Sequence, residues 1–227
     1  ILNRVYDGIM GLVVGDALGV PVEFCERDTF CVADMIGGGT HGLPAGTWSD
    51  DGSLALATLE SLGRRRRIDL RDIMDNFVRW YAHNEFTPYH SVFDIGNTTR
   101  KAIGLYMQGV GVESCGGRSV ADNGNGSLMR ILPLAFVPHT DEDVAAVSAL
   151  THAHPISTGA CEEYVRIAEL LLAGGGPEEA ARLYDDEYDI RKKPRAEVRS
   201  GGYVLDTLDA AVWCFATTSS YRECVLK

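Results

Sequence analysis

Ser49, Asp50 and Asp51 place one hydroxyl and two adjacent carboxylates at the point where a glycine- and proline-containing loop meets an apolar run. Serine is a good N-cap, and acids in the first turn of a helix are stabilised by its exposed N–H groups and its dipole. Two adjacent carboxylates also repel each other, and a hard cation such as Mg²⁺, which binds carboxylates and water, would compensate them. From this spacing alone, helix capping is favoured over a metal site.

Two further acids, Asp16 and Glu23, are embedded in apolar sequence shortly before this segment. A single acid in such a setting is more often a hydrogen-bonded structural group than a catalyst. Because two of them precede another acidic cluster, the sequence favours a functional role more strongly than either acid would alone.

A second segment that could bind a ligand contains both glycines and polar residues. It consists of Ala121, Asp122, Asn123, Gly124, Asn125, Gly126 and Ser127. Its glycines would let backbone N–H groups approach a phosphate, and the helix expected after it, over residues 128–136 with a kink at Pro133, would add its dipole. The pattern is not a Walker loop and no strand precedes it, so a Rossmann site is excluded. From the pattern alone, a plain Asn/Gly turn is favoured.

His152 and His154 are two positions apart, and no matching pair of Cys or His residues would complete a zinc site. Each imidazole is therefore expected either to contact a ligand or to make a structural hydrogen bond. The sequence has no G-x-S-x-G nucleophile elbow and no His-Asp dipeptide. These absences argue against a serine hydrolase and weaken, without removing, the alternative of a metal phosphohydrolase.

The chain of 227 residues has a formal net charge of −11 and a pI of about 4.9. Such an acidic chain disfavours nucleic acid and anionic membranes as general partners and is compatible with a cation site. No apolar run approaches the roughly 20 residues of a membrane helix, and the start of the chain lacks a secretion-signal pattern. The six cysteines form no C-x-x-C pair, which favours reduced thiols and a cytoplasmic protein.

Apolar residues recur every three or four positions through most of the chain, and no convincing strand-like alternation is present. Helices are expected over residues 3–20, 50–63, 69–83, 94–107, 128–136 and 205–215. Three more are expected: one from a cap at Asp141 to Leu150, one that follows His154 and stops at Gly174, and a short one that begins at Pro177. Glycines at positions 8, 11, 15 and 19 would let another element approach the first helix closely. The pattern predicts an all-α fold in which residues 1–227 form a single compact multi-helix domain with long functional loops.

Five motifs follow one another along this chain. They are GDALGVPVEF at 15–24, WSDD at 48–51, GNTTR at 96–100, GNGSLMR at 124–130 and LTHAH at 150–154. Each motif alone is weakly specific, but the ordered set resembles the ADP-ribosylglycohydrolase family, which includes the dinitrogenase-reductase-activating glycohydrolases.

The resemblance implies an all-α fold that holds two Mg²⁺ or Mn²⁺ ions and hydrolyses the glycosidic bond between ADP-ribose and a protein side chain or a small acceptor. It implies Ser49, Asp50 and Asp51 as metal ligands and Glu23 as the catalytic carboxylate near the anomeric carbon. Asp50 would also act in catalysis and in substrate binding. The segment 121–127 would hold the diphosphate, and His152 would contact the ligand. An oxocarbenium-like transition state needs nearby carboxylates and an activated water, and paired metals can orient ribose hydroxyls. The sequence leaves open which carboxylate is the acid and which the base.

Two departures from the family pattern bear on this hypothesis. Gly52 stands where many relatives carry a threonine, and the family's C-terminal G-x-D-T-D-T type motif is absent before Lys227. We therefore expect half of the two-metal site to be missing from this chain, with poor cation affinity and weak activity. A non-catalytic ADP-ribose-binding or crystallin-like member of the family is the alternative that these departures favour.

Overall fold

The computed structural model describes residues 2–185 and 188–227, and helices form its framework. They are α1 Leu2–Gly19, α2 Asp50–Arg65, α3 Leu70–His83, α4 Asn97–Met107, α5 Asp141–Ala149, α6 Pro155–Leu172, α7 Pro177–Tyr184, α8 Val204–Ala216 and α9 Tyr221–Val225. The described residues contain no strand, only isolated β-bridges. The expected all-α fold is confirmed.

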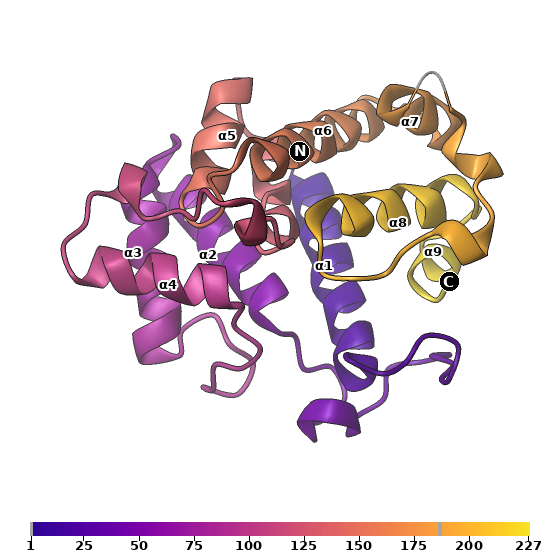
Figure 1. The fold of residues 1–227 in the computed structure, drawn as a ribbon, viewed down its shortest axis with the longest axis horizontal. Helices are drawn as coiled ribbons and strands as arrows, with labels where there is room; N and C mark the ends of the chain where they lie inside the picture. The colour runs from indigo at the N-terminus through magenta and orange to yellow at the C-terminus, as the bar shows by residue number, and fades with distance from the viewer. Residues whose placement is uncertain (1, 186–187) are drawn as a thin grey trace.

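Helix α1 runs through the middle of the molecule in Figure 1. The helices α2, α3 and α4 lie on one side of it, α8 and α9 lie on the other, and α5 to α7 run along the top of the view. The chain packs sequential helices against one another, as in the pairs α2 with α3 and α5 with α6, and α8 returns to α6 and α7. The start of the chain is therefore held between its middle and its end.

The small residues of α1 admit side chains from distant parts of the chain. A Cβ at Gly8 would lie 2.7 Å from Cζ of Phe136, and one at Gly11 would lie 3.5 Å from Cε2 of Tyr221. The Tyr221 hydroxyl also donates a 2.6 Å hydrogen bond to the Gly11 carbonyl. The predicted close approach is confirmed at these two positions, whereas nothing lies within 4 Å of a Cβ at Gly19.

The hydrophobic core is built from the apolar faces that the helical spacing predicts. Its largest fully buried apolar side chains are Leu54, Ile73, Met74, Phe77, Trp80, Ile103, Ile131, Leu134, Val144, Val147 and Leu150. Trp80 is a core residue, and Tyr81 packs against the core while remaining partly exposed. Asp69 caps α3, and Pro177 occupies the first turn of α7, where a helix was expected to begin.

The helix expected over 128–136 is wrong. This segment forms two short 3₁₀ turns, Leu128–Arg130 and Leu132–Phe136. Pro133 lacks an N–H and disfavours the α conformation of the residue before it, so a continuous α-helix cannot propagate through this position.

Several helix boundaries differ from the prediction, among them the start of α4 at Asn97, and one helix was not expected. Helix α2 continues through Gly63 to Arg65, and Arg66, with a φ of 57°, forms its left-handed cap. Helix α5 is capped by Thr140 and not by Asp141, because Thr140 and Asp143 form a reciprocal capping box. Helix α9 was not expected, since its five residues are too few to show a periodic pattern.

The span Asn3–Val22 is long and apolar enough to cross a membrane by length and composition alone. The expectation that no apolar run approaches this length is therefore wrong. Core helices can pass the same test, and α1 packs against α2. Asp16, within the span, also accepts hydrogen bonds from the N-terminus of α2. These contacts make α1 part of the folded helical assembly.

Asp72 joins α3 to the basic end of α2. Its side chain is 3% exposed and accepts hydrogen bonds from Ser61 at 2.6 Å, Arg64 at 2.7 Å and Arg65 at 2.8 Å. Burial opposes the charged form, but the hydrogen bonds from Ser61 and Arg65 outweigh it and lower the pKa of Asp72. Arg64 and Arg65 thus place positive charge in the last turn of α2 and also pair with a buried acid.

Replacing Asp72 with Asn should lower the free energy of unfolding by about 2 kcal/mol, less than for a fully buried pair because both arginines remain half-exposed. Because the folded-state pKa is lowered, this contribution is present above about pH 4 and disappears as the pH falls through the lowered value. Urea denaturation at several pH values measures it. Glu178→Gln, which breaks an exposed pair with Arg182, is the control and should cost under about 1 kcal/mol. Equal losses in the two variants would contradict the prediction.

Candidate functional site

The Asp16 carboxylate, near the end of α1, holds the N-terminus of α2. It accepts hydrogen bonds from the Ser49 N–H at 2.9 Å, the Ser49 hydroxyl at 2.8 Å and the Gly52 N–H at 2.8 Å. Ser49 Oγ in turn accepts from the Asp51 N–H at 3.2 Å, so the predicted N-cap is confirmed. One carboxylate and one hydroxyl therefore satisfy the first N–H groups of α2, which a helix leaves unpaired.

Gly52 allows this contact. A Cβ at this position would lie 2.8 Å from Cδ1 of Trp48 and 3.0 Å from Oδ2 of Asp16. The threonine suggested by the family pattern therefore has no room in the present arrangement. The departure at Gly52 therefore has a steric reason within the site, while the hydroxyl that a threonine would add remains absent.

The acids around this helix end share a strongly anionic environment. Burial, followed by the charges of Asp51, Asp94 and Asp16, raises the pKa of Asp50 well above its ordinary value. Burial and its acidic neighbours likewise raise the pKa of Asp51 to about 8. For Asp16, burial outweighs the hydrogen bonds and raises the pKa as well. The helix dipole alone does not compensate this concentration of carboxylates.

Glu23, His41 and Asp94 form a second group beside these acids. Nε2 of His41 lies 2.8 Å from Oε2 of Glu23, and one ligand atom from each of the three residues lies within 4.8 Å of the others. Burial and then the contact with Glu23 raise the pKa of Asp94 to about 7. Among the described residues, this is the group of histidine and carboxylate ligands whose spacing could hold a metal ion.

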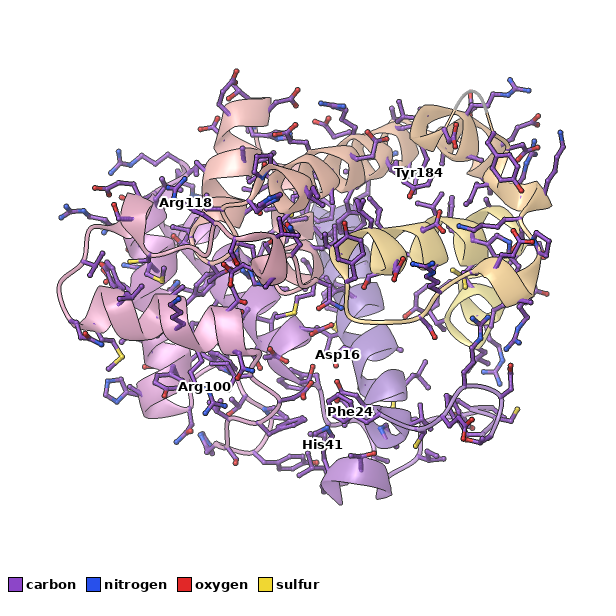
Figure 2. All side chains as sticks on the ribbon, viewed as in Figure 1. Asp16, Phe24, His41, Arg100, Arg118 and Tyr184 are labelled. Carbon is purple, nitrogen blue, oxygen red and sulfur yellow. The ribbon has the colours of Figure 1, made fainter. Side chains whose placement is uncertain are left out.

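The backbone around this group adopts unusual conformations. Phe24, with a φ of 61°, and Asp94, with a φ of 58°, both occupy the left-handed region. The His41 ring lies 6.1 Å from the ring of Phe24, and Figure 2 shows Asp16, Phe24 and His41 near one another at the lower end of α1. Conformations of this kind cost free energy and often occur at functional sites.

His41 and Asp94 were not predicted as site residues, and Asp16 was noted only as an embedded acid. His41 comes from a loop that packs on the turn after α1, where a Cβ at Gly39 would lie 1.8 Å from the Pro21 carbonyl oxygen. The glycine run at 37–39 was the available signal for this close packing. Asp94 carried no distinguishing pattern of its own.

A cleft of about 980 Å³ opens beside these acids. Its wall includes Asp16, Glu23, Ser49, Asp51 and Asp94, together with Asn125 from the glycine-rich segment and residues of α8. The structure thus brings Ser49, Asp51, Glu23 and Asn125 to one cavity, whereas Asp50 and His152 are not among the residues of its wall. Its size is in the range of small-molecule sites.

The segment 121–127 is largely committed to structural contacts. Asp122 accepts from the Ser119 N–H at 2.9 Å, and Asn123 Oδ1 accepts from the Ser157 hydroxyl at 2.8 Å. The Asn125 N–H donates to the Gly202 carbonyl at 3.0 Å. Ala121 is exposed and Ser127 is fully buried. Since only a short 3₁₀ turn follows, the predicted contribution of an α-helix dipole to anion binding is wrong.

The two predicted histidines have different roles. His154 caps α6 by accepting from the Ile156 N–H at 3.2 Å. His152 is 2% exposed and packs against the glycine-rich segment, where a Cβ at Gly126 would lie 2.8 Å from its Cε1. Burial, and then the charge of Arg130, lower the pKa of His152 to about 4, so the imidazole is neutral near pH 7.

The site is an acidic cluster at one helix end, beside a cleft, in an all-α protein. Comparison with known proteins identifies the family to which such a protein belongs. The ADP-ribosylglycohydrolase family model matches residues 1–227. An ADP-ribosylarginine hydrolase, Tri1, from Serratia proteamaculans (strain 568) is 34% identical over 99% of this chain and 65% of its own length. The ADP-ribosyl-[dinitrogen reductase] glycohydrolase of Rhodospirillum rubrum is 32% identical over 99% of this chain and 78% of its own length.

A solved structure, described as an ADP-ribosylglycohydrolase-related protein complex, superposes with a TM-score of 0.82 at 32% identity and covers 98% of this chain and 78% of that one. The chain belongs to the ADP-ribosylglycohydrolase family. It spans 65% of the length of the Serratia relative.

Replacing Gly52 with Ala should destabilise the protein by about 1 to 3 kcal/mol, because the new methyl group overpacks the contact between Trp48 and Asp16. Gly63→Ala in the same helix is the matched control, since nothing lies within 4 Å of its Cβ position. That change should stabilise the protein by about 0.5 to 1 kcal/mol through helix propensity. Thermal and urea unfolding compare the two variants. A neutral or stabilising Gly52→Ala would contradict the steric role.

In buffer free of divalent ions, stability should fall as the pH rises from about 5 to about 8. Unfolded aspartates lose their protons near pH 3.9, whereas folded Asp94 and Asp51 retain theirs up to about 7 and about 8. The unfolded state therefore binds fewer protons across this window, which makes the slope negative. Asp51→Asn should flatten the slope, and Asp7→Asn, at an exposed position of α1, should not. Urea denaturation in EDTA measures it, and a rising profile would count against the electrostatic description.

Proposed function

We propose that this protein hydrolyses the glycosidic bond between ADP-ribose and a protein side chain, with arginine as the first acceptor to test. The observation that carries the proposal is that Glu23 faces the same cleft as Ser49 and Asp51. Family membership and the activities for which the Serratia and Rhodospirillum relatives are named support it. The physiological partner would then be an ADP-ribosylated protein or a small molecule that contains ADP-ribose.

The donor set fits a hard divalent cation. Several carboxylates crowd one partly buried region and their pKa values are raised, so a bound cation would relieve both burial and mutual repulsion. We propose Ser49, Asp50 and Asp51 as ligands for Mg²⁺ or Mn²⁺. Glu23, His41 and Asp94 offer a neighbouring set of ligand atoms. When bound, such ions supply Lewis acidity that orients ribose hydroxyls and water.

Glu23 is the proposed catalytic carboxylate. His41 Nε2, 2.8 Å from its Oε2, orients it, and Asp94 lies against it. In hydrolysis the bond from C1 of the ribose to the acceptor nitrogen breaks and a water oxygen bonds to C1. One proton of that water passes to a carboxylate, and the departing nitrogen gains a proton. A carboxylate beside C1 also stabilises the positive charge of an oxocarbenium-like transition state.

Asp50 has a different place in the proposed reaction. It is 4% exposed, and the charges of Asp51, Asp94 and Asp16 act on it. We propose that it binds substrate hydroxyls and holds or releases a proton next to the reacting carbon.

The segment 121–127 and His152 would receive the ADP part of the substrate. Asn125 lines the cleft, and Gly124 and Gly126 lie against the His152 ring. The N–H groups of Asp122 and Asn125 are already bonded to the carbonyls of Ser119 and Gly202, so we propose that other backbone N–H groups of this segment contact the diphosphate. We also place the protein in the cytoplasm, which its unpaired cysteines support.

The test is release of ADP-ribose from an ADP-ribosylarginine protein by the purified protein, with Mg²⁺, with Mn²⁺ and with EDTA. We expect release that depends on the divalent ion, and Glu23→Gln should reduce kcat/KM by at least about 100-fold through loss of a catalytic carboxylate. Glu26→Gln, at an exposed position three residues away, is the control.

Tight ADP-ribose binding by calorimetry without turnover would contradict hydrolysis and favour a non-catalytic binding protein. Unchanged turnover by Glu23→Gln would remove Glu23 from the mechanism. Release of inorganic phosphate in place of ADP-ribose would favour a metal phosphohydrolase.

A further inference from the structure

Arg130 is a fully buried guanidinium for which no carboxylate partner is found among the described residues. It lies 4.7 Å from the centroid of the Phe77 ring, and both terminal nitrogens donate to the Val147 carbonyl at 3.2 Å. Nη2 also donates a 2.8 Å hydrogen bond to Oγ1 of Thr151. Burying a charge without a counterion is costly, so the arrangement calls for an explanation beyond packing.

The hydroxyl of Thr151 links Arg130 to His152. Thr151 Oγ1 lies 2.8 Å from Nδ1 of His152. A guanidinium can only donate, so Thr151 Oγ1 must act as the acceptor toward Arg130. Its own proton has no acceptor in the described parts of the chain other than His152 Nδ1. Nδ1 therefore accepts, and in a neutral imidazole the proton must then reside on Nε2.

We infer that Arg130 and Thr151 are positioning residues that hold His152 as the neutral Nε2–H tautomer, ready to donate to an acceptor oxygen of bound ADP-ribose. The assignment of the tautomer depends only on the contacts within the protein. The identity of the ligand rests on the proposed function.

The free edge of the imidazole lies at the glycine-rich segment. His152 Nε2 is 3.2 Å from the Cβ position of Gly126 and 3.7 Å from that of Gly124. The side-chain hydrogen bond of this ring within the described residues is made by Nδ1, so Nε2 is left without an acceptor there. Among the described residues, the fully buried side-chain polar atoms without a partner are Arg130 Nε and Glu163 Oε1. His152 Nε2 is not one of them and therefore retains some exposed surface. Nε2 is therefore the one polar atom of this ring left for a ligand.

The surrounding backbone keeps the ring in place. The His152 N–H donates to the Ser148 carbonyl at 2.9 Å, and the Ala153 N–H donates to the Gly117 carbonyl at 2.7 Å. The positive charge of Arg130 acts on the ring and, together with burial, keeps it neutral. A neutral donor can contact an oxygen without the cost of desolvating an imidazolium. The unpaired guanidinium thus has a role that a neutral core residue could not perform.

The tautomer can be read directly from long-range ¹H–¹⁵N spectra, with the His152 signals assigned by comparison with His152→Gln. At about pH 7 we expect an unprotonated nitrogen at Nδ1 and a protonated one at Nε2. Thr151→Val, which keeps the side-chain shape and removes the hydroxyl, should abolish this preference, and Thr151→Ser should restore it. Thermal unfolding establishes that both variants are folded.

A protonated Nδ1 in the wild type, a charged ring at about pH 7, or an unchanged tautomer in Thr151→Val would each overturn the inference. Calorimetry with ADP-ribose provides the second measurement. Thr151→Val should bind it about three- to ten-fold more weakly, the effect of a misplaced neutral hydrogen bond, and Thr151→Ser should bind normally.

The two measurements separate this inference from the proposed function. If the tautomer is as expected but ADP-ribose does not bind to the wild type, the proposed function fails and the positioning role stands. If ADP-ribose binds and Nδ1 carries the proton, the positioning role fails and the proposed function stands.

Discussion

The Asp16 carboxylate is the contact on which the site depends, because it joins the end of α1 to the first turn of α2. Three hydrogen bonds from Ser49 and Gly52 fix the helix that carries Asp50 and Asp51. This contact, together with the packing of α1 against α2, sets the direction of the two acids relative to Glu23 on the segment after α1. The same contact places the Asp16 carboxylate beside Asp50 and Asp51. Its negative charge disfavours their ionised forms and so adds to the electrostatic cost of the site.

This cost indicates what the site is for. Helix N-termini stabilise anions by up to about 2 kcal/mol in favourable geometry, yet the pKa values of Asp50, Asp51 and Asp94 are all raised. The left-handed conformations of Phe24 and Asp94 add backbone strain. A sequence selected only for stability would remove several of these features. Their concentration around one cleft is consistent with a bound cation and substrate that offset the repulsion between the carboxylates.

The features that could be predicted from the sequence are those set by residues close together along the chain, namely the helices and their caps. The helical spacing located α1 to α4, and the caps at Ser49 and Asp69 follow from local chemistry. The order of five weak motifs led to the family, which no single motif could do. His41 and Asp94 were missed because their roles arise only when loops 53 residues apart in sequence meet Glu23. Such contacts leave no periodic pattern.

The wrongly predicted helix at 128–136 and the buried Arg130 have one explanation. In a continuous helix the backbone would satisfy its own hydrogen bonds, and an apolar residue would suit a fully buried position better than an arginine. Here the chain breaks into two 3₁₀ turns around Pro133, and the Arg130 side chain instead bonds to the carbonyl of Val147 and the hydroxyl of Thr151. This conformation lets the guanidinium reach the Thr151 hydroxyl, which in turn contacts Nδ1 of His152. The apolar spacing continues through this segment, but Pro133 interrupts the α-helix and buried polar contacts hold the two turns that replace it.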